Sequence, residues 1–112
     1  MSSRIRISKA GGTWTVRAGG AIIGESDAAL EMVEDGSAPV IYFPRNDIAM
    51  AFLDRSSKSS ECEHKGTASY FSIVTKSTVI ENAAWSYEAP HPDLAEIAEH
   101  IAFYSSDAVT VG

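Results

Sequence analysis

The chain has 112 residues and a formal net charge of −6, with 45% hydrophobic and 21% charged side chains. This composition is typical of one folded domain over residues 1–112 and argues against disorder. The nine cationic residues are scattered along the sequence, whereas binding to a phosphate backbone needs a clustered cationic face. We therefore expect no nucleic acid as a partner.

The single cysteine, Cys62, excludes an intrachain disulfide and a zinc site built mainly of thiolates, and it fits a reducing compartment. The charged N-terminus is not followed by the apolar segment of a secretory signal. The longest apolar runs, 40–43 and 48–53, are too short to cross a bilayer. We expect a cytoplasmic protein without a membrane partner.

Alternating apolar residues predict three strands near the N-terminus, over 5–7, 13–17 and 21–26. The glycine pairs between them favour hairpin turns over a phosphate-binding loop, because no Walker lysine or dinucleotide-binding spacing follows. Residues 26–36 fit either a short helix or a strand, and the family resemblance described below favours a strand.

The middle of the chain combines a β-rich run, 40–43, that ends at Pro44, a buried stretch over 49–53 and a polar serine-rich loop over 54–61. A long hairpin follows, with residues 67–76 leading out and 78–87 returning. Capping and an apolar stripe predict one short helix over 93–101, including His100. Two short strands, 102–104 and 108–111, end the chain.

Reactive side chains are densest in Cys62-Glu63-His64-Lys65-Gly66. In an extended chain Cys62 and His64 lie about 7 Å apart, too far for a direct hydrogen bond. A small packed thiol is the simpler interpretation of Cys62. Lys65 beside Gly66 fits either an exposed strand start or a cation that meets a ligand.

Aromatic residues suggest a binding cleft. Trp85 and Tyr87 share one face of a predicted strand, and with Tyr42, Tyr70 and Tyr104 they are able to line a cleft with flat walls and hydroxyl tips, although ordinary core is the alternative. The predicted ligand-binding residues are Arg45, Asp47, Lys65, Tyr70, Trp85 and Tyr87. A structural Arg45–Asp47 pair at a corner is the alternative for the first two.

Metal chemistry finds little support in the sequence. Zinc needs three or four convergent ligands, and Cys62 and His64 supply two at most. Magnesium-dependent nucleotidyl transfer needs converging carboxylates. Glu25 and Asp27 have a suitable spacing but lack the glycine-serine helix that should precede them, and the adjacent acidic residues 34 and 35 would point apart in a strand. We expect no metal and no cofactor.

Four motifs in this order resemble the domain of unknown function 427 family, which is sometimes labelled nucleotidyltransferase-like. They are YFPRND at 42–47, CEHKGTASY at 62–70, AWSYEAP at 84–90 and IAFY at 101–104, and the resemblance covers residues 13–111. It implies a mainly β domain of β-tent type, with antiparallel strands in two angled sheets, a cleft between the sheets and one short helix near the C-terminus.

The sequence also departs from its relatives. It lacks the paired cysteines of zinc-bearing β-tent domains, and Glu63 and His64 replace the proline and tyrosine typical of the family. We expect a module that binds an unknown small molecule. The alternatives are an enzyme that uses Cys62 as nucleophile or redox thiol and a module that binds a peptide or protein, and a homodimer is also compatible with the sequence.

Overall fold

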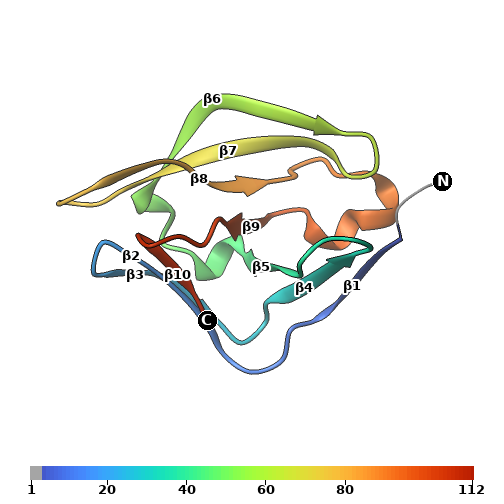
Figure 1. Cartoon of the computed structure of the whole chain (residues 1–112), viewed down its shortest axis with the longest axis horizontal. Helices are drawn as coiled ribbons and strands as arrows, with labels where there is room; N and C mark the ends of the chain where they lie inside the picture. The colour runs from blue at the N-terminus through green and yellow to red at the C-terminus, as the bar shows by residue number, and fades with distance from the viewer. Residues whose placement is uncertain (1–3) are drawn as a thin grey trace.

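The computed structural model describes residues 4–112, and antiparallel strands in two sheets make up most of it (Figure 1). The larger sheet has seven strands, in the order β1 (Ile5–Lys9), β4 (Leu30–Glu34), β5 (Val40–Pro44), β9 (His100–Phe103), β8 (Val79–Ser86), β7 (Gly66–Val74) and β6 (Leu53–Cys62). The smaller sheet has the order β10 (Val109–Val111), β2 (Trp14–Ala18) and β3 (Ala21–Ser26). The predicted mainly β fold with two antiparallel sheets is confirmed.

The central strands of the larger sheet are apolar on both faces. On β5, Tyr42 and Phe43 are both buried but belong to different apolar clusters, and Tyr70 and Phe71 divide in the same way on β7. Successive side chains of a strand point to opposite faces, so one sheet separates two clusters. The Phe43 cluster includes residues of the smaller sheet, and the Tyr42 cluster lies on the opposite face.

The smaller sheet closely approaches the segment that follows β5 at Gly24 of β3, which forms an isolated bridge with Ile48. A Cβ atom at this glycine would lie 2.8 Å from the backbone oxygen of Asp47. Only a residue without a side chain fits this approach.

Several predicted elements are confirmed. The ambiguous segment 26–36 contains strand β4, and the long hairpin is formed by β7 and β8. Strand β5 includes Pro44 as its last residue.

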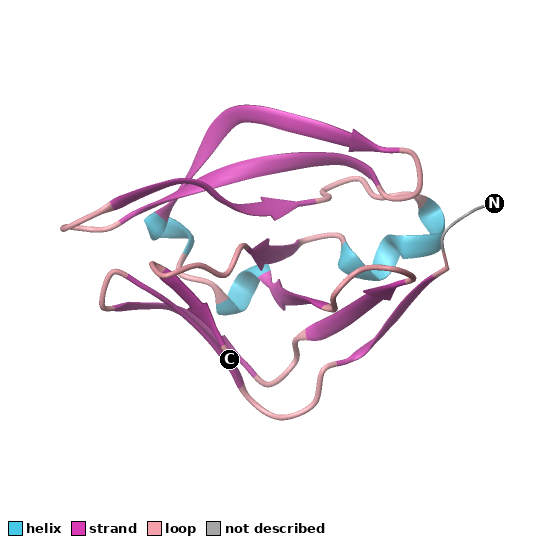
Figure 2. Ribbon diagram, in the orientation of Figure 1, coloured by secondary structure: helices cyan, strands magenta, loops and turns pink. Residues whose placement is uncertain are grey.

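The predicted short helix near the C-terminus is present, but it is a 3-10 helix and is shorter than the predicted segment 93–101. The structure has a 3-10 helix, η3 (Pro92–Ile97), and His100 is the first residue of β9 (Figure 2). Leu94 has non-helical backbone angles and Glu99 has a φ of 58°, so the chain leaves the helical path before His100. The apolar side chains Leu94 and Ile97 are nevertheless buried, which explains the apolar stripe in the sequence.

The predicted serine-rich loop over 54–61 is also wrong, because these residues belong to β6. Strand β6 lies at the edge of the sheet and, among the described residues, pairs with β7 alone, for instance Ser60 with Ala68. An edge strand tolerates polar side chains because its backbone pairing does not depend on their burial. The buried stretch expected at 49–53 contains the 3-10 helix η2 (Met50–Phe52), in which no residue is fully buried.

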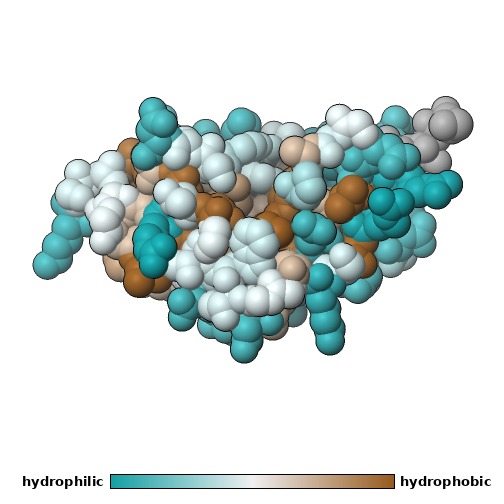
Figure 3. Space-filling view, turned by 60° about the horizontal axis from the view of Figure 1, so that its bottom comes forward, coloured by the Kyte–Doolittle hydropathy of each residue, from teal (hydrophilic) through white to brown (hydrophobic). Residues whose placement is uncertain are grey.

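The surface of one face carries apolar residues in separate patches divided by polar ones (Figure 3). Within residues 4–112, no helix is long and apolar enough to span a membrane.

Candidate functional site

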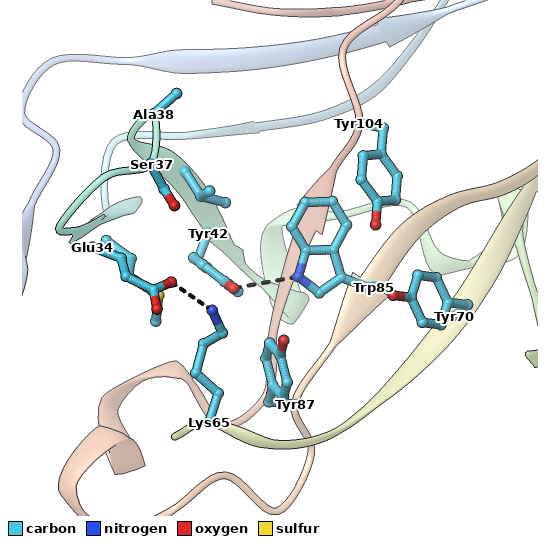
Figure 4. A pocket seen from close by; sticks show the side chains of 11 residues that line it. Glu34, Ser37, Ala38, Tyr42, Lys65, Tyr70, Trp85, Tyr87 and Tyr104 are labelled. Atoms are coloured by element: carbon cyan, nitrogen blue, oxygen red, sulfur yellow. Dashed lines mark hydrogen bonds and ion pairs between the residues drawn. The ribbon is translucent and has the colours of Figure 1, made fainter. Parts of the chain in front are cut away.

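A cavity of about 150 Å³ lies on the face of the larger sheet that carries Tyr42 and Tyr70, and we call it the aromatic cavity (Figure 4). Five aromatic residues line it: Tyr42, Tyr70, Trp85, Tyr87 and Tyr104. Its other lining residues are Met32, Glu34, Ser37, Ala38, Val40 and Lys65. The structure thus brings together four of the predicted ligand-binding residues, Lys65, Tyr70, Trp85 and Tyr87.

Strand register explains why these aromatic residues meet. Ala102 of β9 pairs with Tyr42 of β5 on one side and with Trp85 of β8 on the other, and Trp85 pairs with Tyr70 of β7. Paired residues of neighbouring strands point to the same face, so these four form one row across the sheet. Ala102 is small and fully buried, and across it the Trp85 indole N–H donates to the Tyr42 hydroxyl at 3.3 Å.

Three of the four phenols that line the aromatic cavity have raised pKa values. Burial raises the pKa of Tyr42 to about 12, although the hydrogen bond from Trp85 acts in the opposite direction. Burial is also the main reason that the pKa values of Tyr87 and Tyr104 are raised to about 12. At physiological pH these hydroxyls are therefore neutral groups that can both donate and accept hydrogen bonds.

One ion pair reaches into the aromatic cavity. The Lys65 ammonium donates to Glu34 Oε1 at 2.8 Å, and the two side chains are 16% and 19% exposed (Figure 4). Burial acts to lower the pKa of Lys65, but the hydrogen bond and charge of Glu34 outweigh it, and the pKa is raised. Lys65 therefore keeps its positive charge at neutral pH in a partly desolvated place.

The turn between β6 and β7 positions this lysine. The Lys65 backbone N–H donates to the Cys62 carbonyl at 3.1 Å, and the Lys65 carbonyl accepts from the His91 N–H at 3.0 Å. Gly66 follows with a φ of 112°, and a Cβ there would lie 3.2 Å from the Ala89 oxygen. The glycine is needed both for its backbone angle and for the close approach of residues 89–91.

Tyr70 differs from the other tyrosines of the aromatic cavity. Its hydroxyl shares a hydrogen bond of 2.9 Å with the Ser60 hydroxyl, and the Lys58 ammonium lies 4.6 Å from its ring centre. The hydrogen bond with Ser60 is the main cause that lowers the pKa of Tyr70. Strand β6, which was expected to be a loop, thus supplies the polar partner of an aromatic wall.

A second cavity of about 490 Å³ lies beside the first, and we call it the side cavity. It is lined by residues of both sheets, among them Trp14 of β2, Phe103 of β9 and Val111 of β10. It shares Val40, Trp85 and Tyr104 with the aromatic cavity. The lining of the aromatic cavity comes only from the larger sheet and its connecting segments. The binding cleft that was expected between the two sheets therefore corresponds in position to the side cavity.

Arg45 and Asp47 do not line either cavity. Arg45 forms a salt bridge of 3.0 Å with Glu88, which also binds Arg55 at 2.6 Å. Asp47 accepts a hydrogen bond of 2.6 Å from Ser26 at the end of β3. The two residues thus hold different elements together instead of forming the structural pair considered from the sequence.

Cys62 is half-buried at the end of β6 and is absent from the lining of the aromatic cavity. The ammonium of its neighbour Lys65 is directed to Glu34. Within residues 4–112, no group of three or more histidine, cysteine, aspartate or glutamate side chains is arranged to hold a metal ion.

Sequence reasoning missed Glu34 as a site residue. Glu34 is the last residue of β4, and its partner Lys65 is 31 positions away in the chain. The only sequence signal is the alternation over 30–34, which identifies the strand but not the residue that faces its end.

The comparison with protein families agrees with this fold. Residues 6–112 match the model of a family described as a domain of unknown function, DUF427. A search of curated proteins found no match. The matched residues include every strand of both sheets except the first residue of β1, and the chain therefore belongs to the DUF427 family.

Proposed function

We propose that the protein binds a small molecule in the aromatic cavity. The observation that carries this proposal is the convergence of five aromatic side chains and a half-buried Lys65–Glu34 ion pair on one cavity. Ligand sites typically combine apolar and aromatic walls with a few polar groups that fix orientation. The three raised tyrosine pKa values support the same view, because perturbed groups in a concave place are common at functional sites.

The proposal is tested by ligand-observed NMR with a set of single-ring fragments that includes neutral, cationic, anionic and zwitterionic compounds. A blocking variant, Ala38→Trp, places a large side chain at an exposed position of the cavity lining. Ala28→Trp is the matched control, because Ala28 is an exposed alanine outside the lining of both cavities.

We expect at least one fragment to bind the natural protein and the Ala28→Trp variant, and its signal to disappear with Ala38→Trp. Equal thermal midpoints of the two variants would establish that the loss is local. Binding that survives Ala38→Trp would place the ligand elsewhere, and a set without any binder would count against the function itself.

The thiol-enzyme alternative predicts fast modification of Cys62, which half-burial at the end of β6 permits. Iodoacetamide labelling of the folded protein near neutral pH, followed by intact mass, tests it. Labelling no faster than that of a free cysteine peptide would remove this alternative.

A further inference from the structure

The aromatic cavity holds one cation and one anion, so its charged groups sum to zero. The side chains of Lys65 and Glu34 are each less than one fifth exposed, and an unbalanced charge in such a place is costly. A ligand with a single charge would add an unbalanced ion next to this pair. A ligand that carries both signs keeps the sum at zero and is able to interact with each partner.

We propose that the ligand is a zwitterionic α-amino acid with an aromatic or large apolar side chain. This inference rests on the proposed small-molecule function and names its ligand class. The ligand carboxylate accepts from Lys65, and the ligand ammonium donates to Glu34. The four charges then alternate in sign around the cavity.

The hydrogen-bonding capacity of the two residues fits this arrangement. An ammonium group has three N–H donors, and Lys65 uses one of them for Glu34 Oε1. The carboxylate of Glu34 has further acceptor sites, so the protein ion pair need not open when the ligand binds. Because Tyr42 accepts the indole N–H of Trp85, its own hydroxyl proton is a second donor for the ligand carboxylate.

The aromatic walls of the cavity favour the ammonium group of the zwitterion. An ammonium group is attracted to the faces of aromatic rings, and this attraction grows when water is excluded. Tyr42 and Tyr87 are both buried and line the same cavity as the ion pair (Figure 4).

The side cavity supplies room for the amino acid side chain. An apolar cavity of 150 Å³ is about the size that holds benzene, so the aromatic cavity is too small for both the charged groups and a ring. The side cavity, about 490 Å³ in volume, begins at the shared residues Val40, Trp85 and Tyr104 and continues to Phe103 and Trp14. A ring attached to the charged groups would therefore lie beside Trp85, next to Phe103 and Trp14, in a cavity that Glu31 and Ser105 also line.

The test compares four probes by isothermal titration of the natural protein: L-phenylalanine, 3-phenylpropionate, phenethylamine and glycine. The second lacks the ammonium, the third lacks the carboxylate and the fourth lacks the side chain. We expect L-phenylalanine to bind at least about tenfold more tightly than each of the others, which corresponds to about 1.4 kcal/mol for each missing group.

Two variants test which charged group of the ligand binds Glu34 and which binds Lys65. Glu34→Gln is expected to weaken L-phenylalanine at least about tenfold and to leave 3-phenylpropionate unweakened, and Lys65→Met is expected to weaken L-phenylalanine while sparing phenethylamine. Circular dichroism and thermal midpoints check that both variants fold. The comparison of probes on the natural protein needs no variant and stands even if one does not fold.

The outcomes separate the ligand class from the function. Equal affinity for L-phenylalanine and either singly charged probe would overturn the zwitterion and leave a small-molecule site. Equal affinity for glycine would overturn the use of the side cavity. If none of the four binds but another fragment does and is blocked by Ala38→Trp, the ligand class is wrong and the proposed function stands.

Discussion

Gly24 is the residue that lets β3 approach the segment after β5. Its backbone forms a bridge with Ile48, and a Cβ would lie 2.8 Å from the Asp47 oxygen, a backbone atom that cannot move without its neighbours. Asp47 in turn accepts from Ser26, so both the backbone and the side chain of this residue join β3 to the segment after β5. This contact gives Asp47 a structural role, but with Ser26 as its partner and not with Arg45, which was the partner considered from the sequence.

We expect Gly24→Ala to lower the free energy of unfolding by about 1–3 kcal/mol, because the added methyl group overpacks this junction. Urea unfolding monitored by tryptophan fluorescence measures the change. Gly112→Ala is the control, since nothing lies within 4 Å of a Cβ there, and its effect should stay within about 0.5 kcal/mol. Equal stability of the two variants would contradict the close approach.

At the scale of elements, the row of paired residues on β5, β9, β8 and β7 builds the site. Tyr42, Ala102, Trp85 and Tyr70 stand side by side because of register alone. A shift of one residue in any of these strands would send its side chain to the other apolar cluster. The smallest member of the row, Ala102, keeps the space that the Trp85 indole crosses to reach Tyr42.

We expect Ala102→Leu to fill this space and break the hydrogen bond between Trp85 and Tyr42. The indole N–H resonance of Trp85 should shift, and its hydrogen exchange should become faster. Ala84→Leu is the matched control, because Ala84 is also fully buried in the sheet but belongs to the opposite cluster. Both variants should be destabilised by about 1–3 kcal/mol through overpacking, but only Ala102→Leu should change the Trp85 resonance.

A comparison of the secondary-structure elements shows which of them the sequence patterns predicted correctly. Alternation identified three strands near the N-terminus, β-rich composition identified β5, and the β7–β8 hairpin was also predicted, although β7 is buried on both faces. Alternation failed for β6, whose serines carry no burial signal, since an edge strand is held by backbone pairing. The apolar stripe of η3 correctly indicated buried side chains at Leu94 and Ile97, but local propensity could not reveal that Glu99 turns the chain into β9.

At the scale of the whole molecule, the prediction of the site was limited by long-range contacts. The five aromatic residues were recognisable by type and spacing, and the structure brings all of them to one cavity. Charged residues were harder to place. Lys65 meets Glu34 across 31 positions, and Arg45 meets Glu88 across 43, so nothing local distinguished a cavity residue from a structural one.

The free energy of unfolding is expected to decrease at alkaline pH, because tyrosine hydroxyls are buried in the folded protein. The buried Tyr42 and Tyr87 have pKa values of about 12 in the folded protein, against 10.0 as the ordinary value, whereas Tyr104 is 48% exposed and contributes less. Above pH 10 the unfolded chain loses these protons first, so their contribution to stability is complete below pH 10 and decreases toward pH 12. The raised pKa of Lys65 acts in the same direction.

We expect Tyr42→Phe to make this decrease shallower. A pKa of about 12 in place of 10.0 costs the natural protein about 1.4 kcal/mol between pH 8 and pH 11, and the variant lacks this loss. At pH 8 the variant should itself be less stable by about 1 kcal/mol, because the Trp85 indole loses its acceptor. Urea unfolding at both pH values measures the two effects separately.

Tyr70→Phe is the control for this experiment, because the pKa of Tyr70 is lowered, mainly by its hydrogen bond with Ser60. A group with a lowered pKa adds stability as the pH rises, but the Tyr70 hydroxyl also helps to raise the pKa values of Tyr104 and Tyr87. Tyr70→Phe therefore removes effects of opposite sign, and it should flatten the decrease less than Tyr42→Phe does. If Tyr42→Phe and the natural protein lost the same stability between pH 8 and pH 11, the Tyr42 hydroxyl would have to be open to water. The aromatic cavity would then be a hydrated groove without the dry wall that its proposed ligand needs.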